Sequence, residues 1–200
     1  MNVPDSPRPT GPFLLPSVEV RWFVEGDLPA ALERWIDGRA DPTASGSRTD
    51  AYVALPGAPG TGIKLREGRI EVKTLRHRIP PSPAIPGWVE WWLKWSQPVP
   101  GGLELLEGPG IEVVGVAKER RAWFRDGVLR EVTRVSRGQE SAWTIGLEAP
   151  EAGAGYLDEV EPAVPSNLAA AAVELFRLDG LTDLLLPRRS ASYPEWLSRR

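Results

Sequence analysis

The chain has 200 residues, enough for one sizeable domain or at most two small ones. It contains no cysteine, which excludes disulfides, thiolate catalysis and cysteine-ligated zinc. The net charge of −3 provides no global basic field for nucleic acid, and the single histidine, His77, has no visible partner for a Ser-His-Asp triad.

Simple sequence patterns predict the location of the protein and the nature of its N-terminal segment. No apolar run reaches the roughly 18 residues that cross a bilayer, so we expect no membrane partner. The N-terminal MNVPDSPRPTGP lacks the features of a signal peptide. Its prolines and small residues predict a disordered lead-in over residues 1–16, followed by one domain over residues 17–200. Absence of cysteine is compatible with a reducing compartment, and we expect a cytoplasmic protein.

The first elements are a strand, a helix and a second strand. SVEVRWFV, residues 17–24, alternates polar and apolar residues, which is typical of a strand with one apolar face. LPAALERWIDG, residues 28–38, predicts a short helix that stops at Gly38. RTDAYVAL, residues 48–55, predicts a strand with Arg48 and Asp50 in one phase.

IKLREGRIEVK, residues 63–73, predicts a hairpin. The Glu67-Gly68 pair can form a two-residue turn, which would place Lys64 opposite Glu71. All charges then share one face and all aliphatic side chains the other. Taken alone, this stretch is an ordinary hairpin with a solvated face.

The second half is mostly strands. A proline-rich connection over residues 78–87 precedes four predicted strands and a helix: residues 87–96, 111–124, 129–136, 141–149 and 167–180. Tyr193 and Trp196 near the C-terminus are expected to be packing anchors. About eight strands, two or three helices and no strand–helix–strand alternation predict an α+β fold with an antiparallel sheet, closed or nearly closed.

The polar phase of these strands is rich in charge. It holds eight basic and five acidic side chains: Arg21, Arg48, Lys64, Arg66, Lys73, Lys94, Lys118 and Arg120, with Glu19, Asp50, Glu71, Glu90 and Glu148. In an open sandwich these side chains would face water. In a barrel whose aliphatic face packs outward against helices, they would line a tunnel. Crowded, desolvated cations are costly without a polyanion such as a triphosphate.

The series KLREGRIEVK, GWVEWWLKWS, VAKERRAWF, SAWTIGLEA and SYPEWL resembles the CYTH superfamily, the triphosphate tunnel metalloenzymes. The likeness spans about residues 17–197. It implies an eight-stranded antiparallel β-barrel with accessory helices, a bound triphosphate or polyphosphate, and Mg²⁺ or Mn²⁺. No nucleic-acid partner is expected, and the oligomeric state is left open.

The resemblance also implies roles for individual residues. Substrate binding is expected from the basic residues Arg21, Arg48, Lys64, Arg66, Lys73, Lys94 and Arg120. Metal binding is expected from Glu19, Glu71 and Glu148, and catalysis from Lys118 and Glu148. The family's opening motif E-x-E-x-K reads here as Ser17, Glu19, Arg21, so one carboxylate of a metal site is missing and an arginine replaces the lysine. Asp50 and Glu90 are candidates to compensate.

The sequence is compatible with three functions. The first is metal-dependent hydrolysis of a triphosphate compound. The second is a binding module that captures polyphosphate or a phosphorylated metabolite without hydrolysing it. The third is a structural barrel whose internal charges pair with one another.

Overall fold

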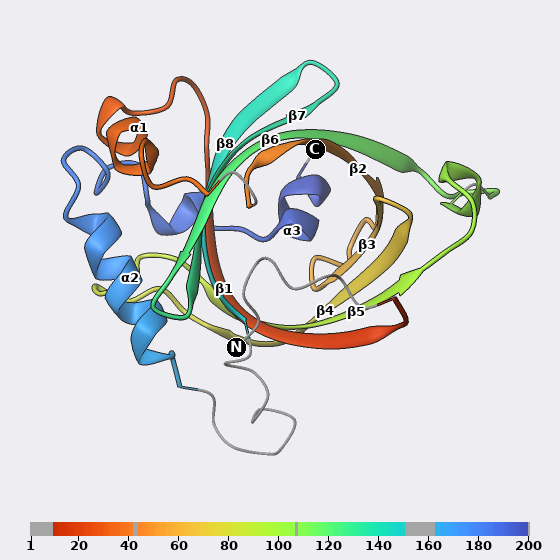
Figure 1. The fold of residues 1–200 in the computed structure, drawn as a ribbon, viewed down its shortest axis with the longest axis horizontal. Coiled ribbons are helices and arrows are strands. Elements are labelled where there is room, and N and C mark those ends of the chain that lie inside the picture. Colours follow the sequence, from red (N-terminus) through yellow and green to blue (C-terminus); the bar gives the residue numbers. More distant parts are fainter. Residues whose placement is uncertain (1–9, 42–43, 107, 151–162, 200) are drawn as a thin grey trace.

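The structure is a computed structural model that describes residues 10–41, 44–106, 108–150 and 163–199. The described chain forms one closed antiparallel barrel with the strand order β1-β5-β4-β3-β2-β6-β7-β8 (Figure 1). The strands are β1 (Phe13–Val24), β2 (Gly46–Val53), β3 (Thr61–Arg66), β4 (Arg69–Ile79), β5 (Val89–Pro98), β6 (Val113–Arg125), β7 (Val128–Arg137) and β8 (Glu140–Pro150). The helices are α1 (Ala30–Ile36), α2 (Ser166–Phe176) and α3 (Tyr193–Ser198), with short 3₁₀ turns at Leu103–Leu106 and Pro187–Arg189. The predicted α+β fold with an eight-stranded barrel is confirmed.

The hairpin of β3 and β4 has the predicted register. Lys64 pairs with Glu71 across the two strands. Glu67 (φ 47°) and Gly68 (φ 71°) both adopt left-handed backbone conformations. Two successive residues of this kind match the right-handed twist of the strands, as in tight two-residue hairpin loops.

The main hydrophobic core lies outside the barrel. Apolar residues of β1, such as Val18, Val20 and Trp22, are fully buried and pack with residues of α1 and α2, including Leu32 and Leu168. Figure 1 shows α1 and α2 together on one outer side of the barrel. The aliphatic face of the sheet therefore points outward beneath these helices, and the charged face of the same strands points inward.

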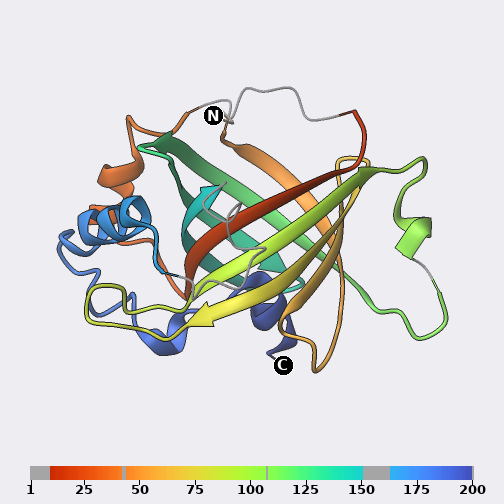
Figure 2. The same ribbon diagram turned by 90° about the horizontal axis from the view of Figure 1, so that it is seen from below.

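Helix α3 closes one end of the barrel. It appears within the ring of strands in Figure 1 and at the lower edge of the barrel in Figure 2. Pro194 lies so close to β3 that a Cβ atom on Gly62 would meet the proline ring at 2.9 Å. Ser192 caps the helix by accepting a hydrogen bond from the Glu195 amide at 3.3 Å. The absence of a side chain at Gly62 therefore allows α3 to pack this closely against β3.

Some boundaries differ from the predictions. The first strand begins at Phe13 rather than residue 17, because β1 continues to pair with β5 as far as Ser96. Residues 1–9 of the expected lead-in lie outside the described residues. His77 lies on β4 next to a bulge, and its ring contacts that of Trp91 edge-on. Within the ranges that the structure covers, no helix is long and apolar enough to span a bilayer.

Candidate functional site: a basic tunnel inside the barrel

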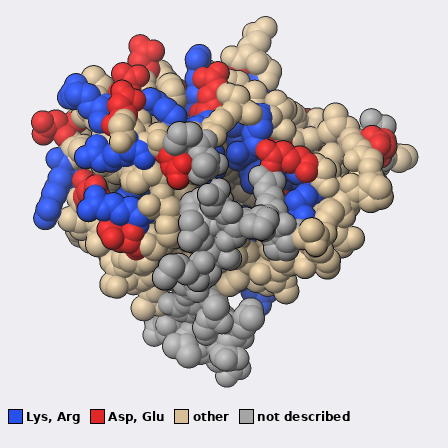
Figure 3. All heavy atoms as spheres, in the orientation of Figure 1, with Lys and Arg blue, Asp and Glu red and all other residues tan. Residues whose placement is uncertain are grey.

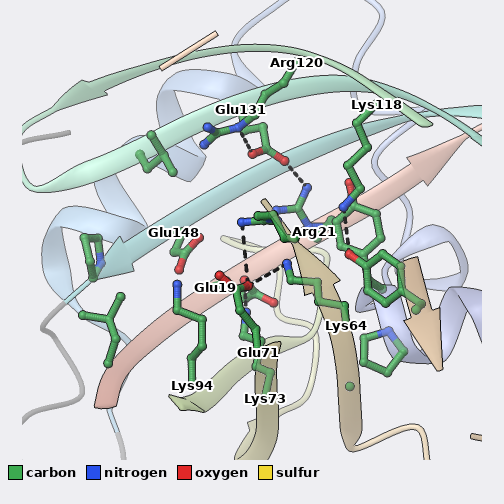
Figure 4. Close-up of a pocket in the computed structure, with 18 of the residues that line it drawn as sticks. Glu19, Arg21, Lys64, Glu71, Lys73, Lys94, Lys118, Arg120, Glu131 and Glu148 are labelled. Atoms are coloured by element: carbon green, nitrogen blue, oxygen red, sulfur yellow. Dashed lines mark hydrogen bonds and ion pairs between the residues drawn. The ribbon is translucent and has the colours of Figure 1, made fainter. Parts of the chain in front are cut away.

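The barrel encloses a cavity of about 310 Å³, which we call the tunnel. All eleven residues predicted as binding, metal or catalytic residues line it: Glu19, Arg21, Arg48, Lys64, Arg66, Glu71, Lys73, Lys94, Lys118, Arg120 and Glu148. In Figure 4 the labelled charged side chains, from strands all around the barrel, point toward one another. The volume is at the small end of the range for ligand pockets, roughly 300–1,000 Å³.

Strand register explains this convergence. Residues directly opposite each other on paired strands project from the same face of a sheet. Glu19 of β1 is opposite Glu148 of β8, and Arg48 of β2 is opposite Lys118 of β6. Once the sheet closes into a barrel, alternate side chains of every strand must point into its interior and meet there.

Asp50 is the centre of the basic wall. This carboxylate is completely buried and lies near four basic groups: Lys118 Nζ at 2.9 Å, Arg66 Nη2 at 3.0 Å, Arg48 Nε at 3.1 Å and Lys64 Nζ at 3.8 Å. Burial alone would raise the pKa of Asp50, but the neighbouring charges outweigh burial and hold this pKa well below its usual range. Asp50 is therefore surrounded by four positive charges, of which those of Lys64 and Arg66 also lie near Glu71, at 3.0 Å and 3.8 Å.

Crowding and burial lower the pKa values of the tunnel lysines Lys64, Lys118 and Lys94. Burial and the charge of Arg66 lower the pKa of Lys64 to about 8. Burial and the charge of Lys64 lower the pKa of Lys118 well below the ordinary lysine value. The pKa of Lys94 is also lowered, chiefly by burial. An anion placed among these groups would reverse these shifts, because it would stabilise the protonated amines.

Glu131 of β7 is a tunnel residue that the sequence analysis missed. It accepts a hydrogen bond from Arg21 Nη1 at 2.7 Å and pairs directly with Arg120. Burial disfavours its charge, but Arg21 and Arg120 lower its pKa well below the usual glutamate value. Polar residues occupy both phases of this strand. Arg130, in the opposite phase, is itself buried and contacts Glu174 of α2, so alternation could not identify the inward phase.

Tyr193 has two roles, of which the sequence predicted one. It packs on Phe23 as an anchor of α3, with ring centroids 5.5 Å apart. It also lines the tunnel, where the ammonium of Lys118 lies 3.7 Å from the centre of its ring. Tyr52 lines the tunnel as well and accepts a hydrogen bond from Lys118 Nζ at 2.8 Å. The two tyrosines form the end wall beside α3.

The carboxylates do not form a metal-binding group as they stand. Among the described residues, no three histidine, aspartate or glutamate side chains are gathered closely enough to hold one ion. Glu19 pairs with Lys73 at 2.8 Å, and Glu71 pairs with Lys64 at 3.0 Å. Ser17 is buried and is not among the residues that line the tunnel. The donor set thus does not fit a hard divalent cation in this arrangement.

The two candidate compensating carboxylates are also engaged with basic groups. Asp50 belongs to the cluster described above. Glu90 pairs with Arg78 Nε at 3.1 Å and accepts a hydrogen bond from Trp92 Nε1 at 3.1 Å. Burial and the charge of Glu19 raise the pKa of Glu90 to about 7.

The outer surface differs from the tunnel. On the face seen in Figure 3, basic and acidic side chains are interspersed. The excess of basic over acidic side chains is therefore found in the tunnel rather than on this face of the surface. The expected absence of a nucleic-acid partner stays a prediction.

Comparisons with known proteins give distant likenesses to solved structures. No family model and no curated protein matches the sequence. Among solved structures, the chain is similar to a conserved hypothetical protein from Pyrococcus furiosus, with 15% identity, a TM-score of 0.47, and 90% of this chain and 98% of that chain covered. It is also similar to the S. pombe Pct1 RNA triphosphatase in complex with the Spt5 CTD, with 10% identity, a TM-score of 0.38, and 90% and 87% covered. Both likenesses are too distant to assign a function. What the structure itself shows is a closed eight-stranded barrel with its charged face turned inward.

Proposed function

We propose that the tunnel binds a compact, highly charged anion of the triphosphate or polyphosphate type. The observation that carries this proposal is the crowding of four basic side chains around the buried carboxylate of Asp50, with Glu71 near two of them. Such a cluster is costly unless a further anion enters it. Arginine forks and lysine ammonium groups both bind phosphate oxygens well.

The balance of charge favours a polyanion over a single phosphate group. Of the residues that the structure describes, eight basic side chains line the tunnel. Five carboxylates face them: Glu19, Asp50, Glu71, Glu131 and Glu148. The basic groups exceed the acidic ones by three. A triphosphate, with about four negative charges spread over many oxygens, would neutralise this excess across the length of the cavity.

Calorimetry with tripolyphosphate at low salt tests the binding. We expect one site per chain, and thermal stabilisation of about 2.7 kcal/mol when the ligand is 100-fold above its dissociation constant. Arg66→Met should weaken binding strongly. The matched control Arg125→Met removes an arginine whose side chain is 60% exposed, outside the tunnel, and should leave binding unchanged. Absence of any shift or heat at millimolar tripolyphosphate would refute the proposal and favour a barrel whose charges only pair internally.

Hydrolysis is a second candidate, favoured by the state of Glu148. Within the described chain, no hydrogen bond or ion pair within 4 Å reaches its carboxylate, which lines the tunnel. Burial disfavours its charge, but Lys73 and Lys94 outweigh burial and lower its pKa. Glu148 could therefore orient a water molecule for attack on a terminal phosphorus, while Lys118 stabilises the charge that develops on phosphate oxygens.

A phosphate-release assay separates the two candidates. Tripolyphosphate and ATP would be incubated with the protein alone, with Mg²⁺ and with Mn²⁺. Turnover that is lost in Glu148→Gln and Lys118→Ala supports a triphosphatase. Tight binding without any release of phosphate supports a binding module.

A further inference from the structure

Three glutamates lie side by side across the wall of the barrel. Glu19 on β1 is directly opposite Glu90 on β5 and directly opposite Glu148 on β8. Side chains at such positions share one face, with Cβ atoms about 4.5–5.5 Å apart. Three like charges in a row repel one another unless cations lie between or beside them.

A lysine supplies the central cation. Lys73 of β4 places its ammonium 2.8 Å from Glu19 Oε2 (Figure 4). Burial disfavours the protonated amine, but the charges of Glu19 and Glu148 outweigh burial and raise the pKa of Lys73 above its ordinary value. The side chain is held against the ring of Trp92, whose centre lies 5.1 Å from the ammonium. Arg78 neutralises the third glutamate, Glu90, at 3.1 Å.

We propose that Lys73 acts as the built-in cation of this wall, so that the tunnel binds its anion without a divalent metal. This inference rests on the proposed anion binding. The ammonium has three donors, of which one is directed at Glu19, and the others remain for ligand oxygens. A divalent ion would have to displace this ammonium before it could reach Glu19.

The test removes the lysine and asks whether a metal takes its place. Mn²⁺ alone, without any anion, would be titrated into the full-length protein and followed by electron paramagnetic resonance. The unaltered protein should bind Mn²⁺ weakly. Lys73→Met keeps a side chain of similar length against Trp92, removes the ion pair with Glu19, and takes away a positive charge near Glu148. It should therefore bind Mn²⁺ at least about tenfold more tightly.

Matched variants separate this effect from a general loss of charge. Lys64→Met removes the same charge from the same tunnel, but from the side of Asp50 and Glu71, and should not gain affinity for Mn²⁺. Lys73→Arg keeps the charge and should behave as the unaltered protein does. The double variant Lys73→Met/Glu148→Gln should lose the gain, because it removes one of the two carboxylates available to the metal.

Calorimetry of the unaltered protein provides a second measurement that does not depend on any variant folding. Tripolyphosphate should bind in the presence of EDTA with the affinity that it shows without chelator. Tight Mn²⁺ binding by the unaltered protein, or tripolyphosphate binding that requires a metal, would overturn the inference and leave anion binding intact. Failure of tripolyphosphate to bind under every condition would instead refute the proposed function, and the Mn²⁺ titrations would still decide the role of Lys73.

Discussion

The carboxylate of Asp50 lies 2.9 Å from the ammonium of Lys118, and both side chains are almost completely enclosed by the barrel. Asp50→Asn would leave Lys118 and the neighbouring Arg66 without their nearest counter-ion. Removing one partner of a buried ion pair is strongly destabilising, and we expect a loss of about 3 kcal/mol in the free energy of unfolding, measured by urea denaturation.

Added tripolyphosphate should restore more stability to Asp50→Asn than to the unaltered protein, because the ligand would supply the missing negative charge. Asp126→Asn is a suitable control, since its side chain is 72% exposed and forms only a surface pair with Arg125. Equal stability of Asp50→Asn and the unaltered protein would show that Asp50 is not the counter-ion of the cluster.

The stability of the ligand-free protein should rise with pH above 8. Burial and Arg66 lower the pKa of Lys64 from 10.5 to about 8, so the unfolded chain binds more protons than the folded chain between these two values. The lowered pKa values of Lys94 and Lys118 act in the same direction. The raised pKa values of Tyr52 and Tyr193 act in the opposite direction near pH 10 and above.

Urea denaturation at pH 7.5, 8.5 and 9.5 measures this dependence, and Lys64→Met should show a shallower rise. A free energy of unfolding that falls steadily over this range would mean that the tunnel lysines are not crowded in the way that the geometry indicates.

Glu90 should produce a pH dependence on the acid side. Burial and Glu19 raise its pKa from 4.5 to about 7, so the folded chain binds more protons than the unfolded chain between these values. Stability contributed by this group is thus present below pH 4.5 and is lost as the pH rises through 7. Glu90→Gln should be more stable than the unaltered protein at pH 8 by about 1–3 kcal/mol, since the raised pKa already includes the attraction of Arg78, which keeps a second partner in Glu195 at 2.7 Å.

Thermal denaturation at pH 5 and pH 8 provides the comparison for Glu90→Gln, with the exposed Glu119→Gln as the control. A variant that is destabilised equally at both values would indicate that Glu90 stays ionised beside Arg78 throughout.

The contact between Lys118 and Tyr193 should be measurable as a coupling energy. The ammonium lies 3.7 Å from the centre of the ring in a nearly dry site, where cation–π contacts contribute about 1–2 kcal/mol. A double-mutant cycle with Lys118→Met and Tyr193→Leu should give a coupling of about this size. Tyr193→Phe keeps the ring and should retain the coupling, and a cycle with no coupling would reduce Tyr193 to a packing anchor of α3.

The alternation of residue types determined much of the wall of the barrel. Lys64 and Glu71 had to share a face because they flank a two-residue turn in opposite strands, and the structure pairs them at 3.0 Å. The period of two in β1 likewise separated Glu19 and Arg21 from Val20 and Trp22. These are local properties, which backbone geometry imposes on any extended chain.

Closure of the sheet decided the rest. A strand pattern is the same whether its charged face meets water or a cavity, so only the helices packed over Trp22 and the pairing of β1 with β8 turned Glu19 inward. Glu131 could not be assigned from sequence, because Arg130 beside it is polar and yet lies outside the barrel against Glu174. The pairing of Lys73 with Glu19 joins residues 54 positions apart, and such a contact exists only after β5 has paired with both β1 and β4. The physical reason is that alternation fixes which side chains share a face, whereas long-range strand pairing fixes what that face meets.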